Sequence, residues 1–171
     1  DHITTLGGDD HIIVSDAQLS QFLSVAAGAG IDIVEVNSDA LVLDADLAGL
    51  VAVEKLRLSA DAVDNAQSVT LGAAAHSAGI TTVDGTAAGA DDALTIDSTA
   101  FSGALTVNTG AGNDIINLGA GGSTVDSGDG DDFVKVGAAN DGTVDDHIAT
   151  GVGSDAIEVD NSLFTEHLVV D

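Results

Sequence analysis

The residues of this 171-residue chain with the clearest chemical potential are aspartates that follow paired glycines. Three nonapeptides stand in tandem: TGAGNDIIN at 109–117, LGAGGSTVD at 118–126 and SGDGDDFVK at 127–135. Each has glycine at its second and fourth positions and a large aliphatic residue at its eighth, and the sixth position holds Asp114, Ser123 and Asp132. Calcium takes about six to eight oxygen ligands from carboxylates and backbone carbonyls. Stacked Gly-x-Gly-x-Asp turns offer both, so the pattern predicts calcium binding.

The same unit recurs elsewhere in the chain. After a five-residue insertion the register resumes with DGTVDDHIA (141–149) and TGVGSDAIE (150–158), and single copies lie upstream as TLGGDDHII (5–13), AGAGIDIVE (27–35) and AAGADDALT (87–95). The predicted carboxylate ligands are Asp10, Asp32, Asp92, Asp114, Asp132, Asp146 and Asp155. Backbone or auxiliary oxygens are expected from Gly28, Gly30, Gly110, Gly112, Asn113, Gly128, Asp129, Gly130, Gly151 and Gly153. Flanking acids that could assist are Asp91, Asp131, Asp141 and Asp145.

The spacing of the copies indicates a stack of coils. Six of the copies begin at 5, 27, 87, 109, 127 and 150, so their first residues are separated by 22, 60, 22, 18 and 23 positions. These separations correspond to one coil every 18 to 23 residues if the longest gap holds three coils. The sixth-position acids from Asp10 to Asp155 are then expected along one edge. The turns at 118 and 141 form the opposite edge, where Ser123 replaces an aspartate.

Carboxylates stacked in this way need a counter-charge. Neighbouring strands lie about 4.7–4.9 Å apart, and two charges at about 4 Å repel by about 1 kcal/mol in water and about 4 kcal/mol at an effective dielectric constant of about 20. An ion between successive turns would convert that repulsion into coordination. The alternative is that Gly and Asp only suit turns, with Asp capping them through local hydrogen bonds.

The elements that position these turns are predicted to be short strands. An aliphatic eighth residue is often followed by a second one two positions later, which is the period of a strand. Within the irregular region 1–86, alternation predicts strands at 41–43, 56–58 and 69–71, and residues 47–53 fit either a helical turn or a strand. Short helices are expected over 16–26, with Asp16 as N-cap, and around 73–78. We expect one domain over 1–171, with calcium-binding coils at 87–158 and a cap or lead-in at 159–171.

Composition excludes several classes of function. Twenty-nine acids and three bases give a net charge of -26, which repels phosphate and argues against nucleic-acid binding. The chain has no Cys and no apolar run of the length that a membrane span needs, so neither disulfides nor membrane insertion are expected. The absence of an initiator Met suggests a piece of a longer precursor. The five His show no spacing typical of a zinc site. Lys55 and Arg57 are expected to pair with nearby acids. We expect no row of Thr or Asn side chains through consecutive coils, which an ice-binding face would need.

The nonapeptides resemble the calcium-binding G-G-x-G-x-D-x-U-x repeat of RTX proteins, with Thr, Ser or Ala in place of the first Gly. The segments 53–61, 69–86 and 101–114 resemble repeats of bacterial surface-layer proteins and large RTX adhesins. This resemblance implies an all-β, right-handed parallel β-roll or β-solenoid with short helical insertions. It also implies several bound Ca²⁺ ions, type I secretion and calcium-dependent folding outside the cell.

These observations predict a non-enzymatic structural module of a secreted bacterial cell-surface protein, suited to surface-layer assembly. Its expected partners are calcium and either further copies or neighbouring domains of the same protein. The alternative is a calcium-dependent adhesin or a glycan- or ice-binding module. A polysaccharide-modifying enzyme is less favoured, because no Tyr and only three bases leave few acid–base groups.

Overall fold

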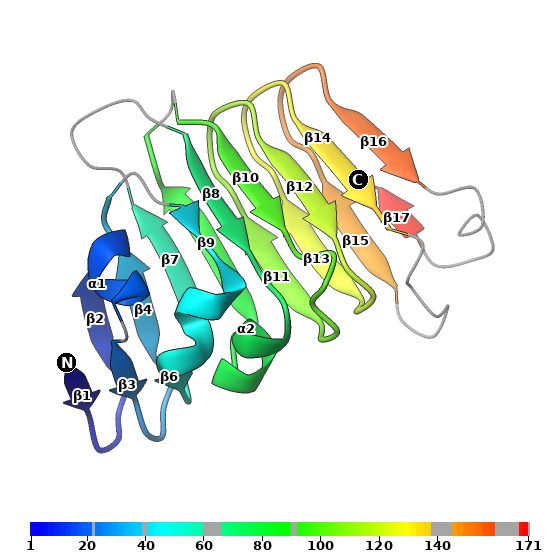
Figure 1. The fold of residues 1–171 in the computed structure, drawn as a ribbon. Helices are drawn as coiled ribbons and strands as arrows, with labels where there is room; N and C mark the ends of the chain where they lie inside the picture. The colour runs from blue at the N-terminus through cyan, green and yellow to red at the C-terminus, as the bar shows by residue number, and fades with distance from the viewer. Residues whose placement is uncertain are drawn as a thin grey trace.

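The chain folds mainly into short strands that form parallel sheets (Figure 1). The computed structural model describes residues 1–21, 23–38, 41–59, 66–89, 92–137, 145–159 and 168–170. In the first half the strands are β1 (His2–Thr4), β2 (His11–Val14), β3 (Ser24–Ala26), β4 (Ile33–Val36), β5 (Leu41–Val42), β6 (Leu50–Val51), β7 (Lys55–Ser59) and β8 (Gln67–Thr70). In the second half they are β9 (Thr82–Ala87), β10 (Leu94–Asp97), β11 (Leu105–Asn108), β12 (Ile115–Leu118), β13 (Ser123–Asp126), β14 (Phe133–Val136), β15 (Asp146–Ala149), β16 (Ala156–Val159) and β17 (Leu168–Val170).

Successive strands from β7 onward alternate between two sheets. The eight-stranded sheet has the order β17-β15-β13-β11-β9-β7-β4-β2, the six-stranded sheet β16-β14-β12-β10-β8-β5, and a three-stranded sheet β1-β3-β6 lies at the N-terminal end. Every strand pair in the described residues is parallel. We call the segment from one strand to its neighbour in the same sheet a circuit.

The circuits vary in length more than their sequence spacing predicts. Ile115 pairs with Phe133, a circuit of 18 residues, and Phe133 pairs with Ala156, a circuit of 23. Lys55 pairs with Thr82, however, so this circuit has 27 residues, because it includes a helix between its strands. The predicted upper limit of 23 is therefore wrong for the middle of the chain.

In the described parts of the chain, three short helices lie between strands. Helix α1 (Asp16–Ser20) is shorter than the helix predicted over 16–26, because β3 begins at Ser24; residue 22 lies outside the described residues. Its N-cap is Ser15 rather than Asp16: the Ser15 hydroxyl accepts the Gln18 N–H, and the Gln18 side chain accepts the Ser15 N–H.

The other two helices pack on each other. Helix α2 (Ala73–Ala78) confirms the helix expected around 73–78, and it packs against the 3₁₀ helix η1 (Asp44–Gly49) and β6. The Asp44 carboxylate accepts N–H groups at the start of α2, from Gly72 at 2.7 Å and Ala75 at 2.9 Å. The segment 47–53 thus holds the end of a helical turn and a strand, the two alternatives that its pattern left open.

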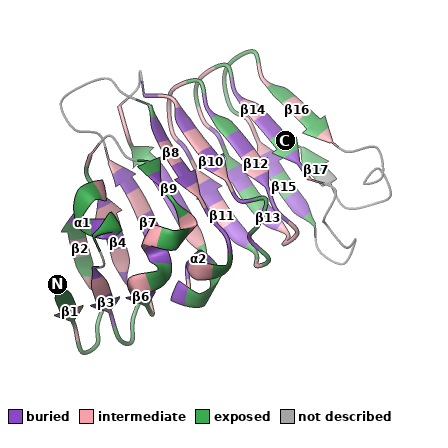
Figure 2. Ribbon diagram, viewed as in Figure 1, coloured by how far each residue is buried: buried purple, intermediate pink, exposed green. Residues whose placement is uncertain are grey.

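The core is formed by the aliphatic residues predicted to point inward. Val34, Val125, Val134 and Ile148 are buried, and Ile116 is fully buried. Along the paired strands aliphatic residues stack in rows: Val125, which was predicted to point inward, lies next to Val107 and Val107 next to Val83 in the eight-stranded sheet. Figure 2 shows the resulting alternation of buried and exposed residues along the strands. Burying one such side chain stabilises the fold by about 1.5–3 kcal/mol.

The outward side of the eight-stranded sheet contains a threonine ladder that the sequence analysis did not expect. Thr82 pairs with Thr106, and Thr106 pairs with Thr124, on three consecutive strands. A parallel row of Asp84, Asn108 and Asp126 lies two residues further along the same strands. The expectation that no such ladder runs through consecutive coils is therefore wrong. The circuits from β9 to β11 and from β11 to β13 differ in length, but strand pairing still places the three threonines opposite one another.

Lys55 and Arg57 pair with acids on this surface, as expected. The Lys55 Nζ lies 2.5 Å from Asp84 Oδ2, and Arg57 Nη2 lies 3.4 Å from the same oxygen. Burial alone would raise the pKa of Asp84, but hydrogen bonds from Lys55 and Thr86 outweigh it and lower that pKa to about 2. Two of the three bases of the chain are thus neutralised in the N-terminal half of the sheet.

Candidate metal centre

Three sixth-position aspartates of the nonapeptides form a ladder before strands of the six-stranded sheet. The Asp132 Oδ1 accepts the backbone N–H of Asp114 at 2.9 Å, and the Asp155 Oδ1 accepts that of Asp132 at 3.0 Å. Asp114 Oδ1 in turn accepts the N–H of Leu94 at 2.8 Å. We call Asp114, Asp132 and Asp155 the C-terminal ladder. The predicted alignment of these three residues is confirmed.

One carboxylate oxygen of Asp114 and one of Asp132 lack a hydrogen-bond partner in the described structure. Asp114 and Asp132 are 1% and 2% exposed, and in the described part of the chain their Oδ2 atoms are buried without a hydrogen-bond partner. Burial raises the pKa of Asp114 above its ordinary value, with a further contribution from the charge of Asp132, against hydrogen bonds from Thr109 and Leu94. A buried carboxylate that lacks a partner is costly, so this place favours a proton or a cation.

Glycines allow the turns before the ladder to stack closely. A Cβ on Gly128 would overlap the carbonyl oxygen of Gly110, and one on Gly130 would overlap that of Gly112. In the next turn, Gly151 and Gly153 lie in the same way over Gly128 and Gly130. The glycines among the predicted ligands with φ in the left-handed region are Gly28, Gly30, Gly110, Gly112, Gly128, Gly130 and Gly151.

Backbone hydrogen bonds join the tips of these turns. The Asp129 N–H donates to the Gly110 carbonyl and the Gly112 N–H to the Asp129 carbonyl, both at 2.9 Å. The side chain of Asn113 accepts the N–H of Asp131 at 2.9 Å. Asn113 and Asp129 therefore lie in the stacked turns as predicted, with backbone oxygens of consecutive turns close together.

The structure corrects the predicted position of Asp92. Strand register places Thr95 opposite Ile115, so Leu94, and not Asp92, is the neighbour of Asp114. The Asp92 carboxylate accepts the Gly89 N–H within its own turn, at 2.8 Å. A shift of two residues keeps every side chain on the same face of a strand, so the apolar pattern of 87–95 could not reveal it. The flanking residues Asp91 and Asp141 lie outside the described residues.

Asp10 and Asp32 lie on the opposite edge from the one predicted. They precede β2 and β4 of the eight-stranded sheet, whereas the C-terminal ladder precedes strands of the six-stranded sheet. The 60-residue gap before 87–95 therefore does not hold a whole number of circuits. Asp32 Oδ1 accepts the N–H of Asp10 at 2.8 Å, and the Oδ2 atoms of both residues are buried without a partner in the described structure.

Glu54 continues this second row, which the sequence analysis missed. Its Oε2 accepts the N–H of Asp32 at 2.9 Å, in the same relation as between Asp32 and Asp10. We call Asp10, Asp32 and Glu54 the N-terminal ladder. The signal was the constant separation of 22 residues, but the turn before Glu54 has Ala52 instead of glycine in the left-handed conformation.

Asp146 occupies its predicted place on the same edge as the N-terminal ladder, further along the stack. It is fully buried, and its Oδ1 accepts the N–H of Ser123 at 2.7 Å. At the sixth position of these two copies, Asp146 therefore lies beside a serine rather than a second aspartate. That this pair is the poorer cation site stays a prediction.

The geometry limits how a cation could be held. No group of three or more His, Asp or Glu side chains that could hold a metal ion is found in the described residues. Consecutive turns do supply two carboxylates and several backbone oxygens, and calcium accepts both kinds of ligand. The Oδ2 atoms without a hydrogen-bond partner are available as ligands, and the close stacking of the turns brings their backbone oxygens together. Both features are consistent with a cation bound between two consecutive turns.

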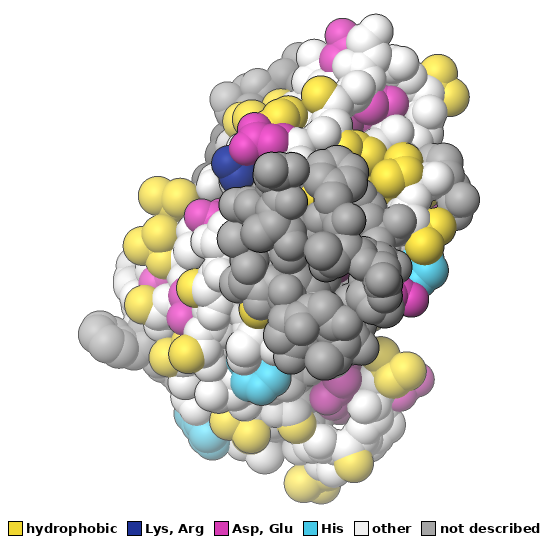
Figure 3. All heavy atoms as spheres, turned by 90° about the vertical axis from the view of Figure 1, so that its right-hand side faces the viewer, with side chains coloured by type: hydrophobic (Ala, Val, Ile, Leu, Met, Phe, Trp, Pro, Cys, Tyr) yellow, Lys and Arg dark blue, Asp and Glu magenta, His cyan; other side chains and the backbone are white. Residues whose placement is uncertain are grey.

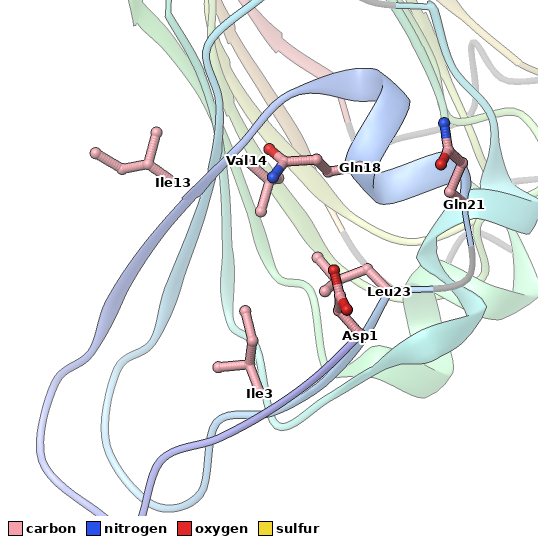
Figure 4. Close-up of a pocket in the computed structure, with 7 residues that line it drawn as sticks. All are labelled: Asp1, Ile3, Ile13, Val14, Gln18, Gln21 and Leu23. Atoms are coloured by element: carbon pink, nitrogen blue, oxygen red, sulfur yellow. The ribbon is translucent and has the colours of Figure 1, made fainter.

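The rest of the described surface contains one pocket of note, which has few groups that could bind a cation. A pocket of about 490 Å³ at the N-terminal end is lined by apolar and amide side chains with Asp1 as its only acid: Asp1, Ile3, Ile13, Val14, Gln18, Gln21 and Leu23 (Figure 4). Acidic side chains are spread over the C-terminal end, where Lys and Arg are scarce (Figure 3). Among the described residues, no helix has the length and hydropathy to cross a membrane.

Comparisons of the chain with protein-family models, with curated proteins and with solved structures found no match. Its function has to be inferred from its own geometry.

Proposed function

We propose that this chain is a non-enzymatic structural module, a right-handed parallel β-solenoid or β-roll that several Ca²⁺ ions fold and rigidify. The observation that carries the proposal is the state of the Asp114 and Asp132 carboxylates. Both are buried, both use Oδ1 to accept an N–H from the preceding circuit, and both leave Oδ2 unpartnered.

The alternative role of aspartate as a turn cap explains only half of this arrangement. Capping accounts for Oδ1, because that atom satisfies a backbone N–H of the neighbouring circuit. It leaves a second, negatively charged oxygen buried beside the next carboxylate. A divalent cation between the turns would satisfy both Oδ2 atoms and remove the repulsion between them, and a site built from oxygens alone favours calcium over softer metals.

Calcium dependence supports a location outside the cell. Extracellular calcium near about 10⁻³ M would fill sites with the affinity of extracellular modules, about 10⁻⁴–10⁻³ M. In the calcium-poor cytoplasm the ladders would repel, which would keep the chain unfolded for type I export. We therefore propose a secreted bacterial cell-surface protein, with surface-layer assembly as its role and neighbouring domains or further copies as its partners.

The test is a calcium titration of the chain followed by far-ultraviolet circular dichroism and size-exclusion chromatography. We expect a mainly coil spectrum in chelator and a β spectrum with calcium, because binding free energy becomes folding free energy when only the folded chain has the site. Ordered assembly should follow folding. A β spectrum that does not respond to chelator would contradict the proposal.

The threonine ladder supports a second candidate, a calcium-dependent adhesin or a glycan- or ice-binding module. Thr82, Thr106 and Thr124 repeat at the strand spacing, about 4.7–4.9 Å, and such a row suits a partner that is itself periodic. A glycan array and an ice-recrystallisation assay on the calcium-loaded chain test this candidate. The matched variants are Thr106→Val, within the ladder, and Thr95→Val, on the outer side of the other sheet. An activity lost in the first variant only would support it, and no activity in either assay would contradict it.

A further inference from the structure

The nonapeptides that contain the C-terminal ladder begin with hydroxyl side chains that the function proposed above leaves without a role. On the edge of the C-terminal ladder these residues are Thr109, Ser127 and Thr150. The Thr109 hydroxyl donates to the Ser127 carbonyl at 3.0 Å, and the Ser127 hydroxyl donates to the Thr150 carbonyl at 3.3 Å. Thr109 and Ser127 are fully buried. Each hydroxyl thus donates to the backbone carbonyl of the residue at the same repeat position one circuit further on.

This hydroxyl row lies beside the candidate metal ligands. Thr109 and Asp114 belong to the same nonapeptide, and both are buried. Asp114 is joined to Asp132 through its backbone N–H. The Thr109 hydroxyl, the Ser127 carbonyl and the two carboxylates therefore bring oxygens of two consecutive turns together.

A hydroxyl has one proton, so Thr109 cannot donate fully to both the Ser127 carbonyl and the Asp114 carboxylate. In the structure the hydroxyl donates to the Ser127 carbonyl, at 3.0 Å. Its proton is thus used by that carbonyl, and the Asp114 Oδ2 is left for a cation.

The N-terminal ladder has only the beginning of such a row. The Thr5 hydroxyl donates to the Ala27 carbonyl, but Ala27 has no hydroxyl with which to continue. The two ladders thus differ in a feature that is separate from their carboxylates, which provides a control within the same molecule.

We propose that the Thr109 and Ser127 hydroxyls are positioning groups for the cation held between the 109–114 and 127–132 turns. Through their hydrogen bonds they hold the Ser127 and Thr150 carbonyls against the preceding circuit. This inference rests on the calcium binding proposed above.

The test compares Thr109→Val with Thr109→Ser, which keeps the hydroxyl, and with Thr5→Val, the same change at the other edge. Isothermal titration calorimetry on the full chain measures calcium affinity and stoichiometry. Europium luminescence lifetimes in H₂O and D₂O count the waters on the bound ion. Outer groups that orient metal ligands typically contribute about 10–100-fold to affinity.

We expect Thr109→Val to weaken calcium binding at one site by about 10–100-fold and to raise the number of bound waters. Thr109→Ser should restore both, and Thr5→Val should leave that site unchanged. If Thr109→Val does not fold with calcium, Ser127→Ala, which removes one hydrogen bond, replaces it with the same expectation.

Two outcomes would overturn the inference in distinguishable ways. If the wild-type chain binds calcium and the Thr109→Val variant has the same affinity and water number, the hydroxyl serves only the fold and the proposed function stands. If the wild-type chain binds no calcium, the proposed function fails and the positioning role fails with it.

Discussion

The two ladders of this molecule use the same hydrogen bond in different surroundings. In both, a carboxylate oxygen accepts the N–H of the preceding circuit, as between Asp132 and Asp114 or between Asp32 and Asp10. Before the C-terminal ladder, glycines stack on glycines through three consecutive turns. Before the N-terminal ladder, Gly30 lies over Gly8 in the same way, but the glycines end at the next turn, where Ala52 takes the left-handed conformation before Glu54. The sheet beside the N-terminal ladder also holds Lys55 and Arg57.

The difference teaches where the chain depends on a cation. In the N-terminal half, two bases and the helices η1 and α2 provide contacts that need no metal. In the C-terminal half Lys135 is the only base, and it pairs with Glu158 on the exposed surface. Calcium should therefore contribute more to the stability of the C-terminal circuits.

The largest expected effect is that of calcium removal on local stability. Calcium at 100 times its Kd stabilises a one-site fold by about 2.7 kcal/mol. Hydrogen exchange measured at saturating calcium and at limiting calcium, where the chain is still folded, should therefore show amide protection falling by about 100-fold or more per site in β12, β14 and β16. Protection in β4 and β7 should fall less. Equal loss in both halves would remove the proposed difference between the ladders.

A second prediction concerns the glycine stack. Gly130→Ala should destabilise the calcium-bound chain by about 2–5 kcal/mol, because its Cβ meets the Gly112 carbonyl and its φ is left-handed. Gly8→Ala is the matched control, since Gly8 also has a positive φ but open space around the missing Cβ, and should cost about 1–2 kcal/mol. Denaturant unfolding of both variants measures the difference. Similar losses would mean that close stacking contributes little.

The third prediction separates the two oxygens of a ladder carboxylate. Asp132→Asn keeps an acceptor for the Asp114 N–H but removes the charge, so calcium affinity should fall about tenfold or more. In chelator the same variant should be more stable than the wild type by about 1–4 kcal/mol, because two buried carboxylates no longer repel. Calorimetry measures the first change, and folding in chelator driven by a stabilising osmolyte measures the second. A variant that is less stable in both conditions would indicate a capping role alone.

The smallest effect concerns Asp84, whose pKa is lowered to about 2. A depressed carboxyl pKa stabilises the fold above the ordinary value of 3.8, and this contribution is lost as the pH falls through about 2. Because Lys55 and Arg57 are partly exposed to solvent, we expect about 1 kcal/mol. Asp84→Asn should flatten the stability profile between about pH 4 and pH 2, measured by urea unfolding at each pH. An unchanged slope would exclude this ion pair as a source of acid sensitivity.

Much of the fold and part of the site followed from local pattern alone. The tandem copies place Asp114, Asp132 and Asp155 correctly, because their circuits run between repeats with the same register. The burial of Val34, Val125 and Val134 follows from the aliphatic eighth residue of each copy, since every second side chain of a strand faces the core. The glycine positions also follow, because the turns need left-handed backbone conformations and space for a neighbouring carbonyl.

Tertiary structure decided what the local pattern leaves open. Period-two alternation is unchanged by a shift of two residues, so only strand pairing shows that Leu94 rather than Asp92 lies above Asp114. The edge occupied by Asp32 depends on how many strands, alternating between the two sheets, lie in the irregular region, where a helix lengthens one circuit. Glu54 joins the N-terminal ladder through its place in that stack rather than through a motif. The sequence by itself determined which residues form turns, strands and core, and circuit length decided which carboxylates meet.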